Sequence, residues 1–305
     1  MTSADDAPRG QRLPAVDLRP QSVLLTFFGD YASDPGASVA AASVIGLLES
    51  AGIGASATRA TLSRMVKRGL LERAPLGRQA CFGLTGFGRR TVLDGRARAQ
   101  DADVADRHWD GRWTIVSFSM PETAQRERHV LRSRLAWAGF GLVHAGLWAA
   151  PRDVDVVGLL ADLAVLPHVT AFRGRATPPT DPASLVAGAF DLAAIAARYT
   201  GFIQRWTPLT PDALGGYPDP LAARVVLGTD WLQVIRADPR LPVEFLDPDW
   251  PAFAAQDLYR GLEARLRGPA ERAAASRLVP GPPVSRAGGA SRSRSASGSA
   301  AAPRP

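Results

Sequence analysis

Apolar residues recur at helical spacing in three separate stretches near the start of the chain. Pro20 suits the first position of a helix whose apolar face ends near Tyr31. Ser38 is placed to cap a second apolar helix, and Ser56 to cap a third that spans residues 57–68. The pattern therefore predicts three short helices in succession.

After Gly69, apolar and polar residues alternate instead of recurring at helical spacing. Gly69 itself suits the end of the third helix, because glycine readily adopts the backbone conformation that ends a helix. The segment LLERAPLGRQACFGLT predicts two short strands around a turn at Gly77 and Arg78. Three helices followed by such a hairpin are the elements of a winged helix-turn-helix. The sequence predicts this unit over residues 19–90.

Strands and helices then alternate through residues 108–178. Strand patterns lie in GRWTIVSFSM, GLVHAGLWAAP and VTAFRGRA, and amphipathic helix patterns lie in ETAQRERHVLRSRLAWAGF and VDVVGLLADLAVL. The order β-α-β-β-α-β is that of a ferredoxin-like domain. Helical patterns at 184–206, 221–236 and 251–266 predict a mostly helical C-terminal domain over residues 179–267. The predicted fold class is α+β.

The remaining segments lack these patterns. Residues 1–18 are polar, without the apolar region of a signal peptide, and predict a disordered leader. Residues 91–107, rich in Asp and Arg, predict an exposed and partly helical linker. Residues 268–305 are rich in Arg, Ser and Pro and predict a disordered tail. No apolar run approaches the roughly 18 residues of a membrane span, which favours a cytoplasmic protein with no membrane partner.

Positive charge is concentrated in one folded stretch. Residues 54–90 carry eight basic residues and one acid, Glu72. Residues 1–53 and 91–266 each have a net charge of −3, and residues 267–305 have +6. A local basic surface on an otherwise slightly acidic folded chain points to a polyanion such as DNA.

The third predicted helix divides into two faces at 100° per residue. Leu62, Met65 and Val66 share the side that must face the domain core. On the opposite side, Ala60 and Ser63 are small enough to let the helix approach base edges, and basic residues beside them can pair with guanine or phosphate. The predicted DNA-binding residues are Ser56, Arg59, Ala60, Ser63, Arg64, Lys67 and Arg68 on the helix, with Arg73 and Arg78 in the hairpin.

Other chemistry has little support in the sequence. The single cysteine, Cys81, has no partner for a disulfide or a multi-cysteine metal site. The four histidines show no metal-ligand spacing, and the acids between Asp238 and Asp249 cluster around prolines, which suits turns. We predict no catalytic residue, no metal and no resident cofactor.

The chain contains, in order, the segments VAAASVIGLLESAGIGASATRATLSRMVKRGLLER, WDGRWTIVSFSMPETAQRERHVLRSRLAWAGFGLVHAGLWAAP and DPRLPVEFLDPDWP. Together they resemble the PaaX family of phenylacetic-acid degradation repressors over about residues 19–266. The resemblance implies a winged-helix domain, a central domain similar to small CRISPR-associated endonucleases and a helical C-terminal domain. It also implies a homodimer on a palindromic operator, released by an aryl-coenzyme A thioester, typically phenylacetyl-CoA.

The chain departs from the family pattern at three positions. Thr58 and Leu70 stand where Val and Trp are more common, and Ser119 stands where related sequences often have Asp. In the endonucleases that strand-end Asp helps to bind metal. Nothing in the resemblance explains the Arg/Ser-rich tail, and no motif locates the residues that would bind an effector.

We expect a sequence-specific DNA-binding regulator, most readily a repressor that contacts a double-stranded operator. A metal-dependent nuclease built on the ferredoxin-like domain is the alternative, and Ser119 opposes it. A ligand sensor with a decayed DNA domain is a third class, which the intact charge and spacing of residues 57–68 oppose.

Overall fold

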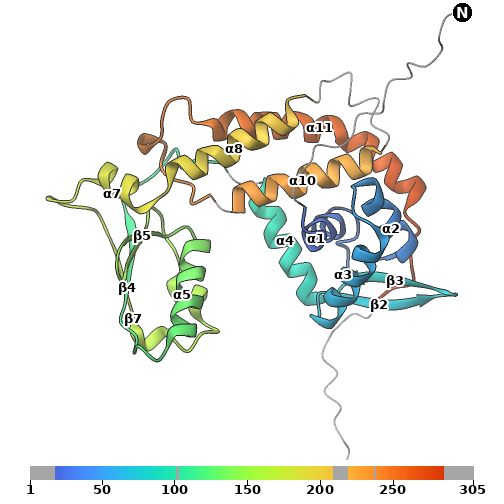
Figure 1. Cartoon of the computed structure of the whole chain (residues 1–305), viewed down its shortest axis with the longest axis horizontal. Coiled ribbons are helices and arrows are strands. Elements are labelled where there is room, and N and C mark those ends of the chain that lie inside the picture. Colours follow the sequence, from blue (N-terminus) through green and yellow to red (C-terminus); the bar gives the residue numbers. More distant parts are fainter. Residues whose placement is uncertain (1–17, 101–102, 209–218, 237, 285–305) are drawn as a thin grey trace, which may run out of the picture.

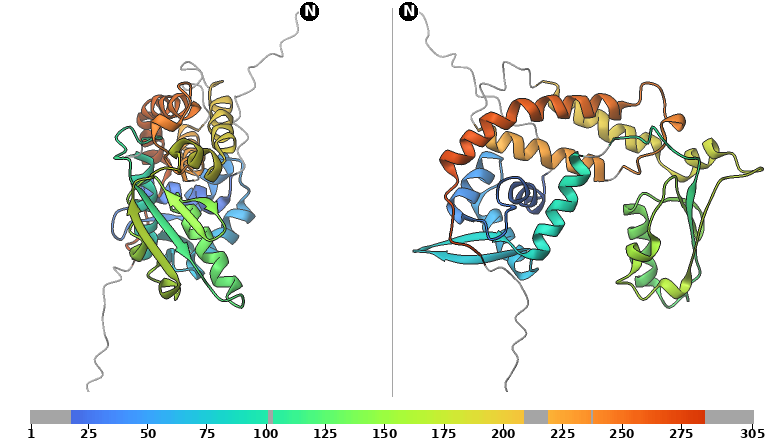
Figure 2. Two further views of the ribbon diagram at one scale, coloured as in Figure 1. Left: turned by 90° about the vertical axis from the view of Figure 1, so that its left-hand side faces the viewer. Right: turned by 180° about the vertical axis from the view of Figure 1, so that it is seen from behind.

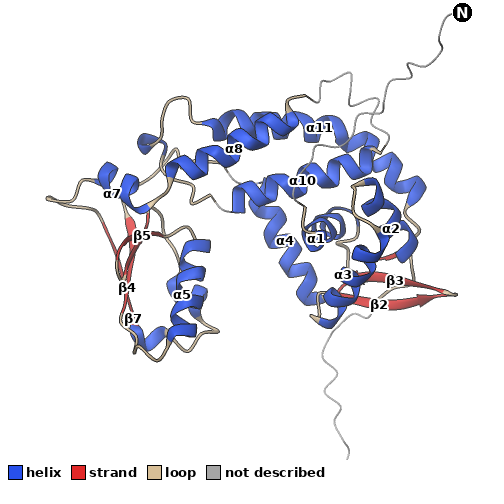
Figure 3. Ribbon diagram, viewed as in Figure 1, coloured by secondary structure: helices blue, strands red, loops and turns tan. Residues whose placement is uncertain are grey.

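The computed structural model describes residues 18–100, 103–208, 219–236 and 238–284. Helices and two antiparallel sheets make it a mixed α/β protein (Figure 1, Figure 3). The two sheets lie apart, on the same side of the long C-terminal helices (Figure 1, Figure 2). The predicted leader lies outside the described residues except for its last residue, Leu18.

The N-terminal unit has the helices and the hairpin that the sequence predicts. Its elements are α1 (Pro20–Tyr31), β1 (Ser38–Ala40), α2 (Ala41–Ser50), α3 (Ala55–Lys67), β2 (Leu71–Leu76), β3 (Gln79–Leu84) and α4 (Gly86–Gln100). The strands form a sheet in the order β1-β3-β2. Leu76 pairs with Gln79, so the predicted turn at Gly77 and Arg78 is confirmed, and Gly77 has the positive φ of 57° that such a turn requires.

Ser38 does not cap a helix. It begins β1, where it pairs with Gly83, and α2 follows with Ala40 as its N-cap and no side-chain capping bond. The Ser38 hydroxyl instead donates to the carbonyl oxygen of Pro282, at 2.7 Å. That partner lies near the other end of the chain, so the sequence around Ser38 gives no sign of it.

The predicted linker over residues 91–107 is partly helical, as the sequence indicates, but it is not exposed throughout. The first part of it belongs to α4, which Thr85 caps by accepting a hydrogen bond from the backbone N–H of Gly88, at 2.9 Å. Val92 of this helix is buried against α1, where a Cβ on Gly29 would touch it. Val104 and Ala105, beyond the helix, are buried as well.

The central unit follows the predicted order of strands and helices. Its elements are β4 (Trp113–Phe118), α5 (Gln125–Trp137), β5 (Gly141–His144), β6 (Leu147–Ala150), α6 (Val156–Leu160) and β7 (Val169–Gly174). All neighbouring strands are antiparallel, in the order β5-β6-β4-β7. Leu131 and Leu135 of α5 pack with Leu160 of α6 against Val116 and Trp148 on one face of the sheet.

The C-terminal helices pack on the central sheet and on the N-terminal unit. They are α7 (Pro182–Ala189), α8 (Leu192–Trp206), α10 (Pro220–Arg236) and α11 (Pro251–Arg277). The single helix predicted over residues 184–206 is two helices, because Asp191 caps α8 by accepting from the N–H of Ala194. No single helix in the described part of the chain is long and apolar enough to cross a membrane; α7 and α8, bent by 66°, pass that test only as a pair.

The chain does not leave the fold at the end of the predicted C-terminal domain. α11 continues to Arg277, and residues 278–284, which we call the C-terminal strap, run along β1. Three of the strap residues are prolines, which have no backbone N–H. The other N–H groups after Leu278 all donate to the N-terminal unit: Val279 to Ser43 Oγ at 3.0 Å, Gly281 to Ser38 O at 2.9 Å and Val284 to Gly36 O at 3.1 Å.

The predicted disordered tail is therefore wrong for residues 268–284, and its remainder lies outside the described residues. An unstructured segment would leave its backbone N–H groups to water, whereas the strap uses every one that it has after Leu278 on protein acceptors. Composition alone does not distinguish a docked strap from a disordered tail, because prolines and glycines are common both in loops and in closely packed extended segments.

The strap covers the outer face of the N-terminal sheet. Side chains alternate along β3, so Phe82 and Leu84 point toward the helices while Cys81 and Gly83 point away from them. Cys81 is nevertheless fully buried, at 0% exposure. A Cβ on Gly281 would overlap Cys81 Sγ, so the strap lies directly on this thiol.

Removing the strap is expected to expose Cys81. In a variant that ends after Arg277, the thiol should react with a maleimide about tenfold faster or more, because it is reached without local opening of the strap. Burial also raises the pKa of the thiol in the intact protein, which further slows the reaction. A variant that ends after Val284 keeps the strap and serves as the control; equal rates in the two variants would show that the strap does not protect Cys81.

Candidate nucleic-acid interface

α3 packs on the N-terminal core through one face. Leu62 and Met65 are buried there, as the spacing predicts, and Val66 is half-buried. Thr58 and Thr61 are buried too, which the sequence reasoning missed. Their hydroxyls donate to the carbonyl oxygens of the residues four positions earlier, at 3.1 and 2.8 Å. This satisfies the hydroxyls within the helix and lets both threonines face the core.

The two ends of α3 differ in how well they were predicted. Ser56 is not the cap: the helix begins at Ala55, and Gly54, with extended backbone, is the N-cap without a side-chain hydrogen bond. Ser56 lies instead in the exposed first turn. Gly69 ends the helix as predicted, with a φ of 70°, while the N–H of Leu70 donates to the carbonyl oxygen of Met65 at 3.0 Å.

The predicted DNA-binding residues all lie on the surface of the N-terminal unit. The exposed residues are Ser56, Arg59, Ala60, Ser63, Arg64, Lys67 and Arg68 of α3, Arg73 of β2 and Arg78 of the turn. α3 follows α2 after the short connection 51–54, and the residues of its outer face are exposed. That these residues contact DNA stays a prediction.

The basic side chains of this surface have few partners within the protein. Arg64 Nη2 donates to Thr61 Oγ1 one turn earlier on α3, at 2.8 Å. Arg68 Nη1 donates to Gln21 Oε1 of α1, at 3.1 Å. Arg59, Lys67, Arg73 and Arg78 have no side-chain hydrogen bond or ion pair with the described residues. Their charges are therefore not neutralised within the described part of the protein and can pair with phosphate.

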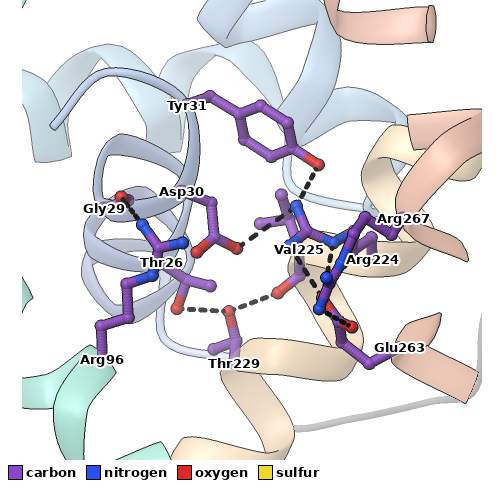
Figure 4. A network of polar contacts seen from close by, with 10 residues as sticks. All are labelled: Thr26, Gly29, Asp30, Tyr31, Arg96, Arg224, Val225, Thr229, Glu263 and Arg267. Atoms are coloured by element: carbon purple, nitrogen blue, oxygen red, sulfur yellow. Dashed lines mark hydrogen bonds and ion pairs between the residues drawn. The ribbon is translucent and has the colours of Figure 1, made fainter. Parts of the chain in front are cut away.

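A polar network ties this unit to the C-terminal helices (Figure 4). Arg224 of α10 donates to the Tyr31 hydroxyl at 2.7 Å and to Glu263 Oε1 of α11 at 2.9 Å, and it lies 3.8 Å from Asp30 Oδ2. Arg267 donates to the other oxygen of Glu263, at 2.8 Å. One guanidinium therefore joins the end of α1 to two helices from the other end of the chain.

Burial and pairing shift the carboxyl groups of this network in opposite directions. Burial raises the pKa of Asp30 above its usual value, and the nearby Arg224 only partly offsets it. Burial also acts to raise the pKa of Glu263, but hydrogen bonds from Arg267 and Arg224 outweigh it and lower that pKa. Glu263 is thus the firmly ionised partner of Arg224.

A second polar contact joins the N-terminal unit to the C-terminal helices. Thr229 Oγ1 of α10 donates to Thr26 Oγ1 of α1 at 3.0 Å, and both side chains are buried (Figure 4). Around it, Leu221, Ala222 and Val225 of α10 belong to the same apolar core as α1 and α3. The N-terminal unit therefore completes its core with residues of the C-terminal helices.

No metal site accompanies these features. The described residues contain no group of three or more His, Cys, Asp and Glu side chains that could hold a metal ion. Ser119, which stands just after β4, is exposed, and its backbone N–H donates to the carbonyl oxygen of His168 at 3.1 Å.

Comparison with known protein families identifies the family to which the chain belongs. A sequence model described as PaaX-like protein matches residues 19–88. A second, described as the PaaX protein central Cas2-like domain, matches residues 106–186, and a third, the PaaX-like protein C-terminal domain, matches residues 190–276. The chain belongs to the PaaX family. The resemblance that the sequence segments indicated is confirmed.

Two known proteins match this PaaX-family protein over most of its length. It is 28% identical to the transcriptional repressor PaaX of Escherichia coli (strain K12) in an alignment 264 positions long, which covers 83% of this chain and 82% of that protein. The structure of the uncharacterized protein Rv0674 from Mycobacterium tuberculosis matches with a TM-score of 0.56 and 21% identity, covering 82% of this chain and 96% of the other. At that identity the second likeness concerns the fold alone.

Proposed function

We propose that this PaaX-family protein is a sequence-specific DNA-binding transcriptional repressor, and that its N-terminal unit acts as a winged helix-turn-helix. The observation that carries the proposal is the exposed basic face of α3, whose cations have no carboxylate partner among the described residues, with the β2–β3 hairpin directly after it. The similarity to the transcriptional repressor PaaX of Escherichia coli supports the same role.

In this arrangement α3 enters the major groove. Ala60 and Ser63 allow close approach, and Arg64 and Lys67 reach base edges or phosphates. Arg78 in the hairpin turn and Arg73 in β2 contact the DNA backbone, which fixes the register of the protein on the duplex without reading sequence. Arg59 and Arg68 flank the helix and add phosphate contacts.

We also propose that the central unit is ferredoxin-like. Its order of elements is β-α-β-β-α-β and its strands follow the order β5-β6-β4-β7, while the matching family domain is described as Cas2-like. Family membership supports a regulator over the nuclease alternative, in agreement with the prediction that the chain is not an enzyme.

For regulation, we propose a homodimer in the cytoplasm that binds a palindromic operator and is released by an aryl-CoA thioester such as phenylacetyl-CoA. The support is the family resemblance together with a small crevice of about 90 Å³ between α1, α4, α10 and α11. Leu25 and Leu232 give it apolar walls, and a Cβ on Gly95 would have no atom within 4 Å. A ligand there would favour one arrangement of the N-terminal unit against the C-terminal helices.

A mobility-shift experiment with the DNA upstream of the protein's own gene tests the function. We expect a complex that survives an excess of unrelated DNA and weakens by about one power of salt concentration for each phosphate contact. Binding without preference for that DNA would contradict sequence-specific repression, and a response flat in salt would contradict DNA binding altogether.

The effector proposal is tested by adding ligands to the same complex of protein and DNA. Phenylacetyl-CoA should release the complex, whereas free coenzyme A should not. Gly95→Leu should keep DNA binding but block release, because leucine fills the crevice and is well tolerated in a helix. Release of this variant at the wild-type concentration would show that the crevice is not the effector site.

A further inference from the structure

A second and larger cavity lies beside the small crevice. It is a cleft of about 630 Å³ between helices α4 and α10 on one side and the central unit on the other. Thr91 and Gly95 of α4 and Leu232 of α10 line the first wall, while Trp137 of α5 and Leu159 of α6 line the second (Figure 1). Sites for organic ligands are common between domains and have volumes of about 300 to 1,000 Å³. The cleft is therefore large enough for such a ligand, whereas the crevice, at about 90 Å³, holds only a small part of one.

The two cavities meet at four residues that line both of them. These are Thr91 and Gly95 of α4 and Leu232 and Arg236 of α10. A Cβ on Gly95 would have no atom within 4 Å, so the point at which the cavities meet is open. A single ligand can therefore occupy the crevice with one end and the cleft with the rest.

The charges of the cleft favour an anion. The charged residues that line it are Arg152, Arg236, Arg240, Asp153, Asp155 and Asp238. Asp153 is paired with Arg173, which does not line the cleft, so the lining arginines outnumber the remaining aspartates. Asp155 caps the N-terminus of α6, and Asp238 accepts hydrogen bonds from a tyrosine hydroxyl and a backbone N–H. Arg236 has no side-chain hydrogen bond or ion pair with the described residues, so its guanidinium is able to pair with an anionic ligand.

An exposed aromatic ring stands in the opposite wall of the cleft. Trp137 is the last residue of α5, and its side chain is 48% exposed. It belongs to the lining of the cleft and not to that of the crevice. The face of an indole ring stacks well on flat ring systems such as nucleobases. The two walls together suit a ligand that carries both an anionic group and a flat ring.

We propose that the crevice and the cleft form one binding site for an elongated organic anion. Its small neutral end occupies the crevice, and its larger body, with phosphate groups and a flat ring, occupies the cleft. Arg236 pairs with a phosphate of the body, and Trp137 stacks on its ring. The inference rests on the proposed function for its ligand, because an aryl-CoA thioester has a small aryl end and a body that carries phosphates and an adenine ring.

Helix α4 connects this site to the predicted DNA-binding helix. The Thr85 hydroxyl, which caps α4, also donates to the carbonyl oxygen of Gly69, the residue that ends α3, at 2.6 Å. A Cβ on Gly88 would overlap the carbonyl oxygen of Leu70, so the first turn of α4 lies directly on the chain that follows α3. A ligand between Gly95 and the central unit fixes the position of α4, and α4 contacts the end of α3. Occupancy of the site therefore favours one placement of α3 over others.

Calorimetric titration of the full-length protein with phenylacetyl-CoA tests the site. Arg236→Gln and Trp137→Ala should each weaken binding by about tenfold, because each removes either a charged hydrogen bond or a ring stack. Trp137→Phe keeps an aromatic ring and should recover most of the affinity. The control is Arg132→Gln on α5, which removes one exposed charge outside the cleft and should bind as the wild type does. Unchanged thermal unfolding midpoints would show that the losses do not arise from misfolding.

Free coenzyme A distinguishes the two parts of the site. It lacks the aryl end, so it should bind more weakly than the thioester but lose affinity in the Arg236→Gln and Trp137→Ala variants by the same factors. Gly95→Leu should remove the difference in affinity between phenylacetyl-CoA and free coenzyme A, because the leucine closes the opening between the crevice and the cleft.

Wild-type affinity in the Trp137→Ala variant would overturn the inference, even if Arg236→Gln bound more weakly, since Arg236 also lines the crevice. If phenylacetyl-CoA nevertheless released the wild type from DNA, the effector proposal would stand without the cleft. The expected losses of affinity without any release from DNA would refute regulation by this thioester and leave the binding site standing. A wild-type protein that bound neither phenylacetyl-CoA nor free coenzyme A would refute both.

Discussion

Replacing Arg224 with methionine is expected to lower the free energy of unfolding by about 3 to 5 kcal/mol. The guanidinium is 11% exposed and hydrogen-bonds Glu263 and Tyr31, which come from opposite ends of the chain. Methionine keeps most of the side-chain volume but leaves the carboxylate of Glu263, 17% exposed, with Arg267 alone. Urea unfolding monitored by tryptophan fluorescence would measure the loss.

The matched control is Arg260→Met on the neighbouring helix α11. Arg260 lies 3.9 Å from Asp103, but both side chains are more than half exposed. Exposed pairs of this kind contribute little, so its effect should stay below about 1 kcal/mol. Equal losses in the two variants would show that the buried network does not join the N-terminal unit to the C-terminal helices.

The polar network around Arg224 also makes the free energy of unfolding depend on pH, in a direction that follows from the pKa shifts. The pKa of Glu263 is lowered in the folded protein, so its contribution is fully present above its usual value of 4.5 and is lost as the pH falls through the lower folded value. Asp30 has the opposite sign, because its pKa is raised and its ionisation opposes folding as the pH rises. The Arg224→Met variant should therefore lose less stability than the wild type on acidification below 4.5.

The second large effect concerns DNA. Arg64→Ala combined with Lys67→Ala is expected to weaken operator binding by about 30-fold or more, because each base contact contributes about 1 to 3 kcal/mol. Binding to unrelated DNA should fall much less, since it depends on the whole set of phosphate contacts. Parallel titrations of both duplexes at one salt concentration would measure the two losses.

Arg126→Ala with Arg132→Ala is the control for charge. Both arginines are exposed on α5, away from the N-terminal sheet, and the double change removes the same two charges (Figure 1). It should leave the ratio of operator binding to unrelated binding at the wild-type value. If the α3 variant also kept that ratio, the outer face of α3 would not be the surface that reads bases.

Local rules account for what could be predicted from the sequence. Gly69 and the turn at Gly77 and Arg78 act through the conformational freedom of glycine, a property of the residue itself, and both predictions were confirmed. The buried face of α3 follows from helical spacing, which is equally local. Thr58 and Thr61 were missed because a hydroxyl that bonds its own helix behaves as a core residue.

Contacts between residues far apart in the sequence could not be predicted, because they produce no local sequence pattern. The Ser38 hydroxyl bonds a residue 244 positions away, and nothing near Ser38 signals it. Thr26 and Thr229 meet across 203 positions, in helices whose individual patterns were recognised without their partners. For the candidate interface, exposure could be predicted from periodicity, whereas the contact of Arg68 with Gln21 on α1 could not.

The C-terminal strap also constrains when the N-terminal unit can be finished during synthesis. Its outer face is closed by residues 280–284, and its core includes Ala274, so the ribosome has released almost the whole chain before these contacts can form. A nascent chain that stalls before that point would expose Cys81 and lack part of its core. The N-terminal unit can therefore complete its core and close its outer face only after almost the whole chain has been synthesised.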